Sequence, residues 1–249
     1  MTEETVHERT TVAEGQLVMP FYLVCDVSYS MTHDMPALNA GIRQLCQAIG
    51  REPQVDDVAQ VGIITFSAGA QVAMPLTQMS EEAHIPTLSA QSSTNYGAAF
   101  RILALTIDED LKNLKAKGYK AYRPCAFFLT DGEPTDDTWF QTFTSTLTYD
   151  KAARQGNKAH PIFVPFGFRD ARDDVLSKLA YPPERGKWFH AKTHDIKEAL
   201  DGILNAIMTS VFNSGLSGSA GTPTLMIQTS SPVGNLVAQD SQYDSQWPS

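Results

Sequence analysis

The chain has 249 residues, enough for one large domain that buries its core without the help of disulfides. Its hydrophobic content of 42% and aromatic content of 9% are ordinary for a globular protein. The formal net charge of −9 argues against nucleic acids and anionic membranes as partners, because both require a positive protein surface.

The amino terminus and the cysteines predict a location. The first residues, "MTEETVHERTTVAEGQ", are polar and lack the apolar core of a signal peptide. No stretch approaches the ~20 apolar residues of a membrane span. The chain has three cysteines, Cys25, Cys46 and Cys125, and their spacing is not that of a metal site. Free cysteines of this kind usually behave as small buried hydrophobic residues. We therefore expect a reducing compartment, most simply the cytoplasm.

Short apolar runs predict the strands. The segment "VGIITFSAGAQVAMPL" has a turn signal at 67–69 and predicts an antiparallel hairpin. Two prolines, Pro161 and Pro165, are expected to push their strand outward in the sheet. The predicted strands are 19–27, the hairpin 61–76, 124–132, 160–168 and 187–191.

Apolar residues at three- and four-residue steps predict the helices. In chain order these are 35–50, 95–117, 138–155, 171–180 and 195–212. Strands that alternate with helices indicate an α/β fold: a doubly wound, Rossmann-like open sheet with helices on both faces. We expect six strands, mainly parallel, with one antiparallel edge strand.

The two ends of the chain differ from this body. We expect a polar extension at 1–16, one domain at 17–212 and a flexible tail rich in Ser, Gly and Gln at 213–249. Within the tail, "GLSGSAG" (215–221) is predicted to be a linker, since it lacks the ending of a phosphate-binding loop. The segment 222–230 is a candidate for an extra strand.

Oxygen-bearing side chains gather where predicted strands end. In "FYLVCDVSYSM" the apolar run is followed by Asp26, Ser28 and Ser30, and in "FFLTDG" the apolar run is followed by Asp131. Thr94 lies in a loop just before a long helix. In a doubly wound sheet, ligands bind outside the carboxyl ends of the strands. If the two strands are neighbours, two carboxylates and three hydroxyls reach one point.

This set of ligands favours a hard cation. Oxygens without imidazole or thiolate select Mg²⁺, with Mn²⁺ or Ca²⁺ as alternatives, over zinc and copper. Each piece alone also has a structural explanation. Asp and Ser are common turn residues, Gly132 suits a turn after Asp131, and Thr94 could simply cap the following helix. It is the joint occurrence at element boundaries that points to a metal site.

The sequence resembles the von Willebrand factor type A (vWA) family over about residues 17–212. The metal-ion-dependent adhesion site (MIDAS) of that family has the pattern D-x-S-x-S, then Thr, then Asp. Here "DVSYS", "SSTN" and "LTDG" match all five positions. The resemblance implies a vWA fold and a cation that accepts a Glu or Asp from a partner protein.

The chain more narrowly resembles bacterial tellurite-resistance-associated TerY-type members. The supporting stretches are "MPFYLVCDVSYSM", "VGIITFSAGAQVAMPLT", "STNYGAAFRIL" and "RPCAFFLTDGEPTDD". This resemblance implies a stand-alone cytoplasmic module in a stress-response system, with kinase or phosphatase partners.

We therefore expect a binding module and no enzyme. The alternatives are a metal-dependent hydrolase or phosphatase and a scaffold with a purely structural metal. Against phosphatase chemistry, a serine stands at position 28, where a second carboxyl group would have to act as the general acid. Glu133, Asp136 and Asp137 are expected to form a solvated rim and to cap the next helix. Residues adjacent to the ligands, Tyr29, His33, Asp34 and Tyr96, are hypothesised to contact a partner.

Overall fold

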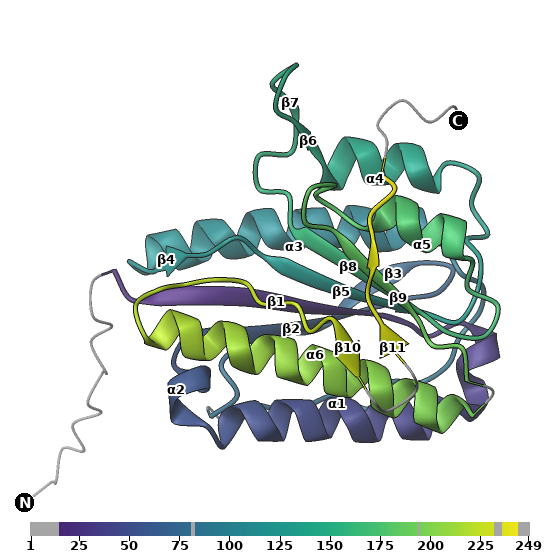
Figure 1. Cartoon of the computed structure of the whole chain (residues 1–249), viewed down its shortest axis with the longest axis horizontal. Coiled ribbons are helices and arrows are strands. Elements are labelled where there is room, and N and C mark those ends of the chain that lie inside the picture. The colour runs from purple at the N-terminus through teal and green to yellow at the C-terminus, as the bar shows by residue number, and fades with distance from the viewer. Residues whose placement is uncertain (1–14, 81–82, 194, 232–235, 244–249) are drawn as a thin grey trace, which may run out of the picture.

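The computed structural model describes residues 15–80, 83–193, 195–231 and 236–243. A twisted sheet forms its middle layer, and helices cover both faces (Figure 1). The strands of this sheet are β1 (Leu17–Asp26), β2 (Ala59–Phe66), β3 (Ala70–Thr77), β4 (Lys120–Ala121), β5 (Cys125–Thr130), β8 (Ile162–Gly167), β9 (Lys187–His190) and β12 (Gln239–Asp240).

The strand order is β12-β9-β8-β5-β1-β2-β3, and β4 pairs with β1 beside this path. The pairs from β9 through β8, β5 and β1 to β2 are parallel. At the edges, β3 and β12 are antiparallel to their neighbours. The predicted doubly wound, mainly parallel fold is thus confirmed. The sheet has an antiparallel strand at both edges, whereas the prediction was a single antiparallel edge strand.

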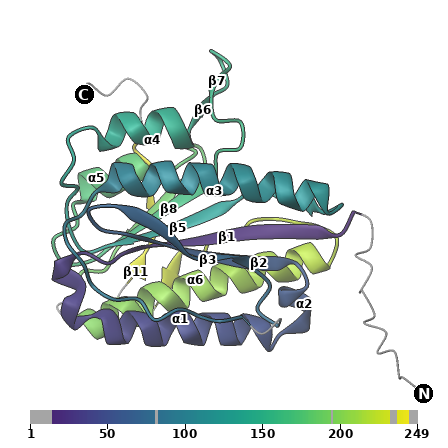
Figure 2. The same cartoon turned by 180° about the vertical axis from the view of Figure 1, so that it is seen from behind.

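Helices sandwich the sheet between two layers. Figure 2 shows α3 and α4 on one face and α1, α2 and α6 on the other. The helical segments are η1 (Tyr29–His33), α1 (Met35–Gly50), α2 (Pro53–Asp56), α3 (Tyr96–Ala116), α4 (Trp139–Leu147), α5 (Asp173–Leu179) and α6 (Ile196–Ser219). Smaller ladders join β6 (Tyr149–Asp150) to β7 (Gln155–Gly156) and β10 (Ser230–Ser231) to β11 (Leu236–Val237).

The central strand β1 explains why the core has two halves. Successive side chains of a strand point to opposite faces. Phe21, Leu23 and Cys25 accordingly pack in the cluster under α1 and α6, while Tyr22 and Val24 pack in the cluster under α3. A strand that is buried on both faces must be apolar throughout, so its polar residues are confined to its end.

The prediction that prolines push the strand 160–168 outward is wrong. β8 lies between β5 and β9, and Pro165 is paired with Phe128 of β5. Pro165 is tolerated because the β9 ladder begins only at Phe166. On that outer side of β8, Phe163 instead donates its N–H to the carbonyl of Tyr181 at 2.8 Å. Pro165 therefore lies between the segments that pair with this side of β8, at a position where no backbone N–H donor is required.

Two predicted boundaries also change. The helix expected over 138–155 ends at Leu147, and the β6–β7 hairpin follows it and projects from the body (Figure 1). The linker prediction for 215–221 is wrong, because α6 continues to Ser219. Gly215 packs against Val55, and Gly218 packs against Met19. Small residues here allow close packing against neighbouring elements.

The tail folds back over the domain within its described part. Beyond α6 the chain crosses beside β9, where β12 pairs with it (Figure 1). Of the candidate strand 222–230, only Ser230 lies in a strand. Residues 1–14 of the predicted extension and 244–249 of the predicted tail lie outside the described residues. The three cysteines are buried and unpaired, as expected.

Candidate functional site

The sheet order brings the two predicted aspartates to the same edge. β1 and β5 are direct neighbours, with Cys25 paired to Leu129. Asp26 ends β1, and Asp131 follows the last residue of β5. Both carboxylates are buried, with relative exposures of 1% and 2%. The two acidic side chains therefore lie together at the carboxyl edge of the sheet, which is the ligand-binding edge of such folds.

Hydrogen bonds join four of the five predicted ligands. The Oγ atoms of Ser28 and Ser30 are 3.0 Å apart. Ser30 Oγ donates to Asp131 Oδ1 at 2.9 Å, and the backbone N–H of Ser28 donates to Asp26 Oδ1 at 2.8 Å. Asp26, Ser28, Ser30 and Asp131 thus form one connected group at the tips of β1 and β5.

Thr94 lies buried in the adjoining loop, which is tied to the serine loop. Tyr29 donates its N–H to the carbonyl of Ser92 at 2.8 Å. The cap of α3 is Asn95, whose side chain accepts from the N–H of Ala98 at 2.8 Å. The alternative explanation of Thr94 as a helix cap is therefore wrong, and its hydroxyl is left without that role.

The spacing of the oxygens suits a small dication. Around an octahedral Mg²⁺ with bonds of about 2.1 Å, neighbouring ligands lie about 3 Å apart. The separations from Ser28 Oγ to Ser30 Oγ and from Ser30 Oγ to Asp131 Oδ1, 3.0 and 2.9 Å, are of this size. These residues would hold the cation, which would supply a positive charge with an open position for an acidic ligand.

This kind of site differs from a cluster of strong metal ligands. In the described part of the chain, no group of three or more His, Cys, Asp or Glu side chains is placed to hold a metal ion. The present set has two carboxylates, and its other donors are hydroxyls. A cation here would keep more of its charge than one among three carboxylates and would attract a further acidic group more strongly.

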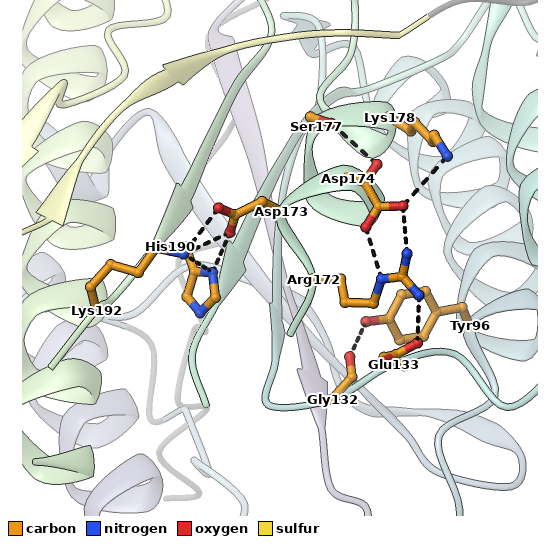
Figure 3. A network of polar contacts seen from close by, with 10 residues as sticks. All are labelled: Tyr96, Gly132, Glu133, Arg172, Asp173, Asp174, Ser177, Lys178, His190 and Lys192. Carbon is orange, nitrogen blue, oxygen red and sulfur yellow. Dashed lines mark hydrogen bonds and ion pairs between the residues drawn. The ribbon is translucent and has the colours of Figure 1, made fainter. Parts of the chain in front are cut away.

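A second hydroxyl network supports Asp26 from below. Thr130 Oγ1 donates to Asp26 Oδ2 at 2.8 Å, and the phenol of Tyr96 contacts Thr130 Oγ1 at 3.0 Å and Gly132 O at 2.8 Å. Figure 3 shows the bond from Tyr96 to Gly132. Burial raises the pKa of Asp26 to about 6, while hydrogen bonds from Ser28 and Thr130 oppose that rise. The network thus favours the charged carboxylate that a cation needs.

The hypothesis that four residues contact a partner is wrong for Tyr96. Its side chain is fully buried, and its N–H and that of Gly97 donate to Asp136 at 2.9 and 3.0 Å. Asp136 was expected to cap the following helix but instead accepts from the first two N–H groups of α3. Asp34 is also mostly buried. Tyr29, at 78% exposure, does project from the loop of the serines.

Ion pairs lie on the outer rim of this edge of the sheet. Glu133 pairs with Arg172 at 3.3 Å, and Arg172 also pairs with Asp174 at 2.8 Å (Figure 3). A neighbouring cluster joins Asp173, His190 and Lys192 (Figure 3). The pairs of Arg172 are largely exposed, so each contributes little to stability.

Sequence patterns missed Thr130, Arg169 and the role of Asp34. Thr130 is a polar residue at the end of an otherwise apolar strand, which is a usable signal. Arg169 follows the predicted strand 160–168 at the same carboxyl edge of the sheet. Its guanidinium contacts Asp131 Oδ2 at 3.1 Å and Asp34 Oδ2 at 2.5 Å. The position of Arg169 beside Asp131 could be placed only once β8 was known to be the neighbour of β5.

Comparisons with known proteins agree with this architecture. Residues 21–133 match the family model of the von Willebrand factor type A domain, a range that includes all five predicted ligands. The fold of the chain is that of the vWA domain. No curated protein sequence matches the chain.

Three solved structures illustrate the likeness in fold. The ArnB paralog VWA2 from Sulfolobus acidocaldarius has TM-score 0.51 and 15% identity, covering 77% of this chain and 46% of that one. Proximal thread matrix protein 1 from the mussel byssus, with a zinc-occupied MIDAS motif, has TM-score 0.52 and 14% identity, covering 80% and 49%. The pilus adhesin SpaC from Lactobacillus rhamnosus GG has TM-score 0.54 and 15% identity, covering 78% and 30%. The chain thus spans less than half the length of each.

Proposed function

We propose that this protein is a non-catalytic binding module whose divalent cation accepts a carboxylate from a partner protein. The cation is held by Asp26, Ser28, Ser30, Thr94 and Asp131. The observation that carries the proposal is the connected group formed by the buried carboxylates of Asp26 and Asp131 with the hydroxyls of buried Ser28 and exposed Ser30, whose neighbouring oxygens lie about 3 Å apart. Mg²⁺ is the ion we propose, with Mn²⁺ and Ca²⁺ as alternatives, because all the donors are hard oxygens.

The surroundings of the site support a protein partner. Ser30 is exposed beside the buried acids, so the proposed cation would face solvent on that side. Tyr29 adds a large exposed ring next to it, and exposed aromatic residues are frequent anchors of protein interfaces. The partner would present Glu or Asp to the cation and cover Tyr29 with apolar surface.

The biological setting is a further part of this proposal. The resemblance of the motif regions to TerY-type proteins supports a bacterial stress-response or tellurite-resistance system, with a kinase or phosphatase as a partner. The buried, unpaired cysteines support a reducing, cytoplasmic location. Within the described ranges, no helix is long and apolar enough to cross a membrane.

The test combines metal binding with capture of partners. Isothermal titration with Mg²⁺ and Mn²⁺ is expected to give one site in the wild type and none in Asp26→Ala. Capture from host lysate is then run with wild type in Mg²⁺, wild type in EDTA and Asp26→Ala in Mg²⁺. The matched control is Asp108→Ala, which removes an exposed aspartate on α3 that pairs only with Lys112 among the described contacts.

The outcomes separate the three candidate functions. Partners retained only by the wild type and Asp108→Ala in Mg²⁺ support the cation as the anchor. Identical capture under all conditions would refute it. If EDTA unfolds the domain, as followed by circular dichroism, the metal is structural and the protein is a scaffold. Phosphatase activity that requires Mg²⁺ and Asp26 would instead favour the enzyme.

A further inference from the structure

Arg169 occupies an unusual backbone position at the edge of the proposed site. It follows β8 and has a φ of 52°, in the left-handed region that residues other than glycine rarely adopt. The loop is fixed on both sides of it. Phe168 donates its N–H to Thr130 O at 3.2 Å, and Asp170 donates its N–H to Asp131 O at 3.0 Å. The strained conformation is thus maintained by the end of β5 and directs the side chain to the site.

One guanidinium nitrogen of Arg169 donates two hydrogen bonds and makes a close ion pair with a third oxygen, which has no hydrogen bond of its own. Arg169 Nη1 lies 3.1 Å from Asp131 Oδ2, 3.1 Å from the carbonyl oxygen of Ser30 and 2.5 Å from Asp34 Oδ2. The side chain of Arg169 is 27% exposed, so these contacts are partly shielded from water. Asp131 Oδ1 accepts from Ser30, so both oxygens of this carboxylate are occupied.

The charges of the site explain this arrangement. Asp26, Asp34 and Asp131 would repel one another if they were buried together without a cation. The guanidinium of Arg169 offsets part of that charge. A dication at the proposed ligands would share Asp131 with the guanidinium of Arg169. The two positive charges would lie close together and repel each other.

We propose that Arg169 is the resident cation of this site, which competes with the divalent ion for Asp131 and thereby sets the metal affinity. The inference rests on the proposed function, because it requires the metal to bind at Asp131. Metal binding weakens the contact between Arg169 and Asp131 and leaves the guanidinium on Asp34. The site is therefore tuned to weak binding of the free ion, so that a partner carboxylate is needed to complete tight binding.

The experiment measures the affinity for Mg²⁺ and Mn²⁺ alone by isothermal titration, on the full chain. Arg169→Gln is expected to bind each ion at least tenfold more tightly than the wild type. Arg169→Lys retains the charge and is expected to stay within about threefold of the wild type. The matched control is Arg172→Gln, in the same loop, whose partners are the exposed Glu133 and Asp174. It is expected to leave the affinity unchanged.

Equal affinities for wild type and Arg169→Gln would overturn the role of Arg169, while leaving the metal site itself intact. If no variant and no wild type binds either ion, the proposed function fails, and the competition fails with it. Should Arg169→Gln not fold, side-chain NMR of the wild type decides. A shift of the Arg169 guanidinium resonance on addition of Mg²⁺, larger than that of Arg172, supports the proposal, and an unchanged Arg169 resonance overturns it.

Discussion

Ser30 donates its hydroxyl to Asp131 at 2.9 Å, and thereby connects two loops that are 101 residues apart in the sequence. The bond exists because β1 and β5 are neighbours in the sheet and both end at the same edge. A serine that donates a hydrogen bond to a buried carboxylate in this way also places its own oxygen beside that carboxylate, where it could bind a cation. The connection between the two loops and the proposed metal binding would therefore depend on the same hydroxyl.

Ser30→Ala is expected to weaken Mn²⁺ binding by at least tenfold, because one oxygen ligand is lost and the coordination shell must be completed by water. Isothermal titration measures the change. Thr32→Ala is the matched control, since its exposed hydroxyl belongs to the same η1 turn but donates to Tyr29 O. Equal losses in the two variants would mean that the turn, and not the hydroxyl ligand, matters for the metal.

Thr130→Val is expected to lower the free energy of unfolding by about 1–3 kcal/mol. The valine keeps the shape but leaves a buried carboxylate oxygen of Asp26 and the phenol of Tyr96 with one hydrogen bond fewer each. Urea unfolding in EDTA measures this without a contribution from metal binding. Thr144→Val, on α4, removes a hydroxyl whose exposed hydrogen bond goes to Gln141 O; it is the control and should change stability by less than about 0.5 kcal/mol. A neutral Thr130→Val would show that the network does not stabilise the fold.

The sequence was sufficient to predict a mainly parallel α/β sheet and the edge at which the candidate ligands lie. A strand buried on both faces must be apolar, so an aspartate and two serines directly after such a run are conspicuous. The contribution of Arg169 could not be predicted in this way, because it depends on the order of strands and on a left-handed backbone. Likewise Asp136 accepts hydrogen bonds from the start of α3, a helix that precedes it in the chain, and no local pattern reveals this pairing.

The end of α6 shows why composition misled the prediction there. "GLSGSAG" has the low helix propensity of a linker. In the fold, however, a Cβ at Gly215 would come within 2.8 Å of Val55 Cγ1, and the side chain of Ser214 accepts from the N–H of Met226. Small residues serve close packing and the return of the chain. Tertiary contacts outweigh propensity in this segment.

Gly215→Leu should therefore destabilise the fold by about 2 kcal/mol or more through overpacking, although leucine has the better helix propensity. Asn213→Leu adds the same side chain to an exposed position of α6 and should be nearly neutral. Thermal unfolding of the two variants gives the comparison. A stable Gly215→Leu would show that residues after Phe212 do not pack on α2.

His160 provides a prediction for the dependence of stability on pH. Its imidazole is buried, stacks on Tyr149 and meets Tyr181 edge-on. Burial, together with the positive charge of Arg123, lowers its pKa to about 4 from the ordinary 6.5. The unfolded chain thus binds more protons than the folded protein between these values. The contribution of His160 is complete above pH 6.5 and is lost as the pH falls toward 4, by roughly 3 kcal/mol at most.

His160→Phe removes this titration while it keeps an aromatic ring, so its stability should fall less than that of the wild type between pH 7.5 and 4.5. Urea unfolding at both pH values measures the difference. The raised pKa of Asp26 acts in the opposite direction, since its folded form holds a proton up to about pH 6. Because both proteins contain Asp26, the difference between them isolates His160. The control His33→Phe, at an exposed position, should show the same pH dependence of stability as the wild type. If His160→Phe and the wild type lost the same stability between the two pH values, His160 would be protonated without cost inside the fold.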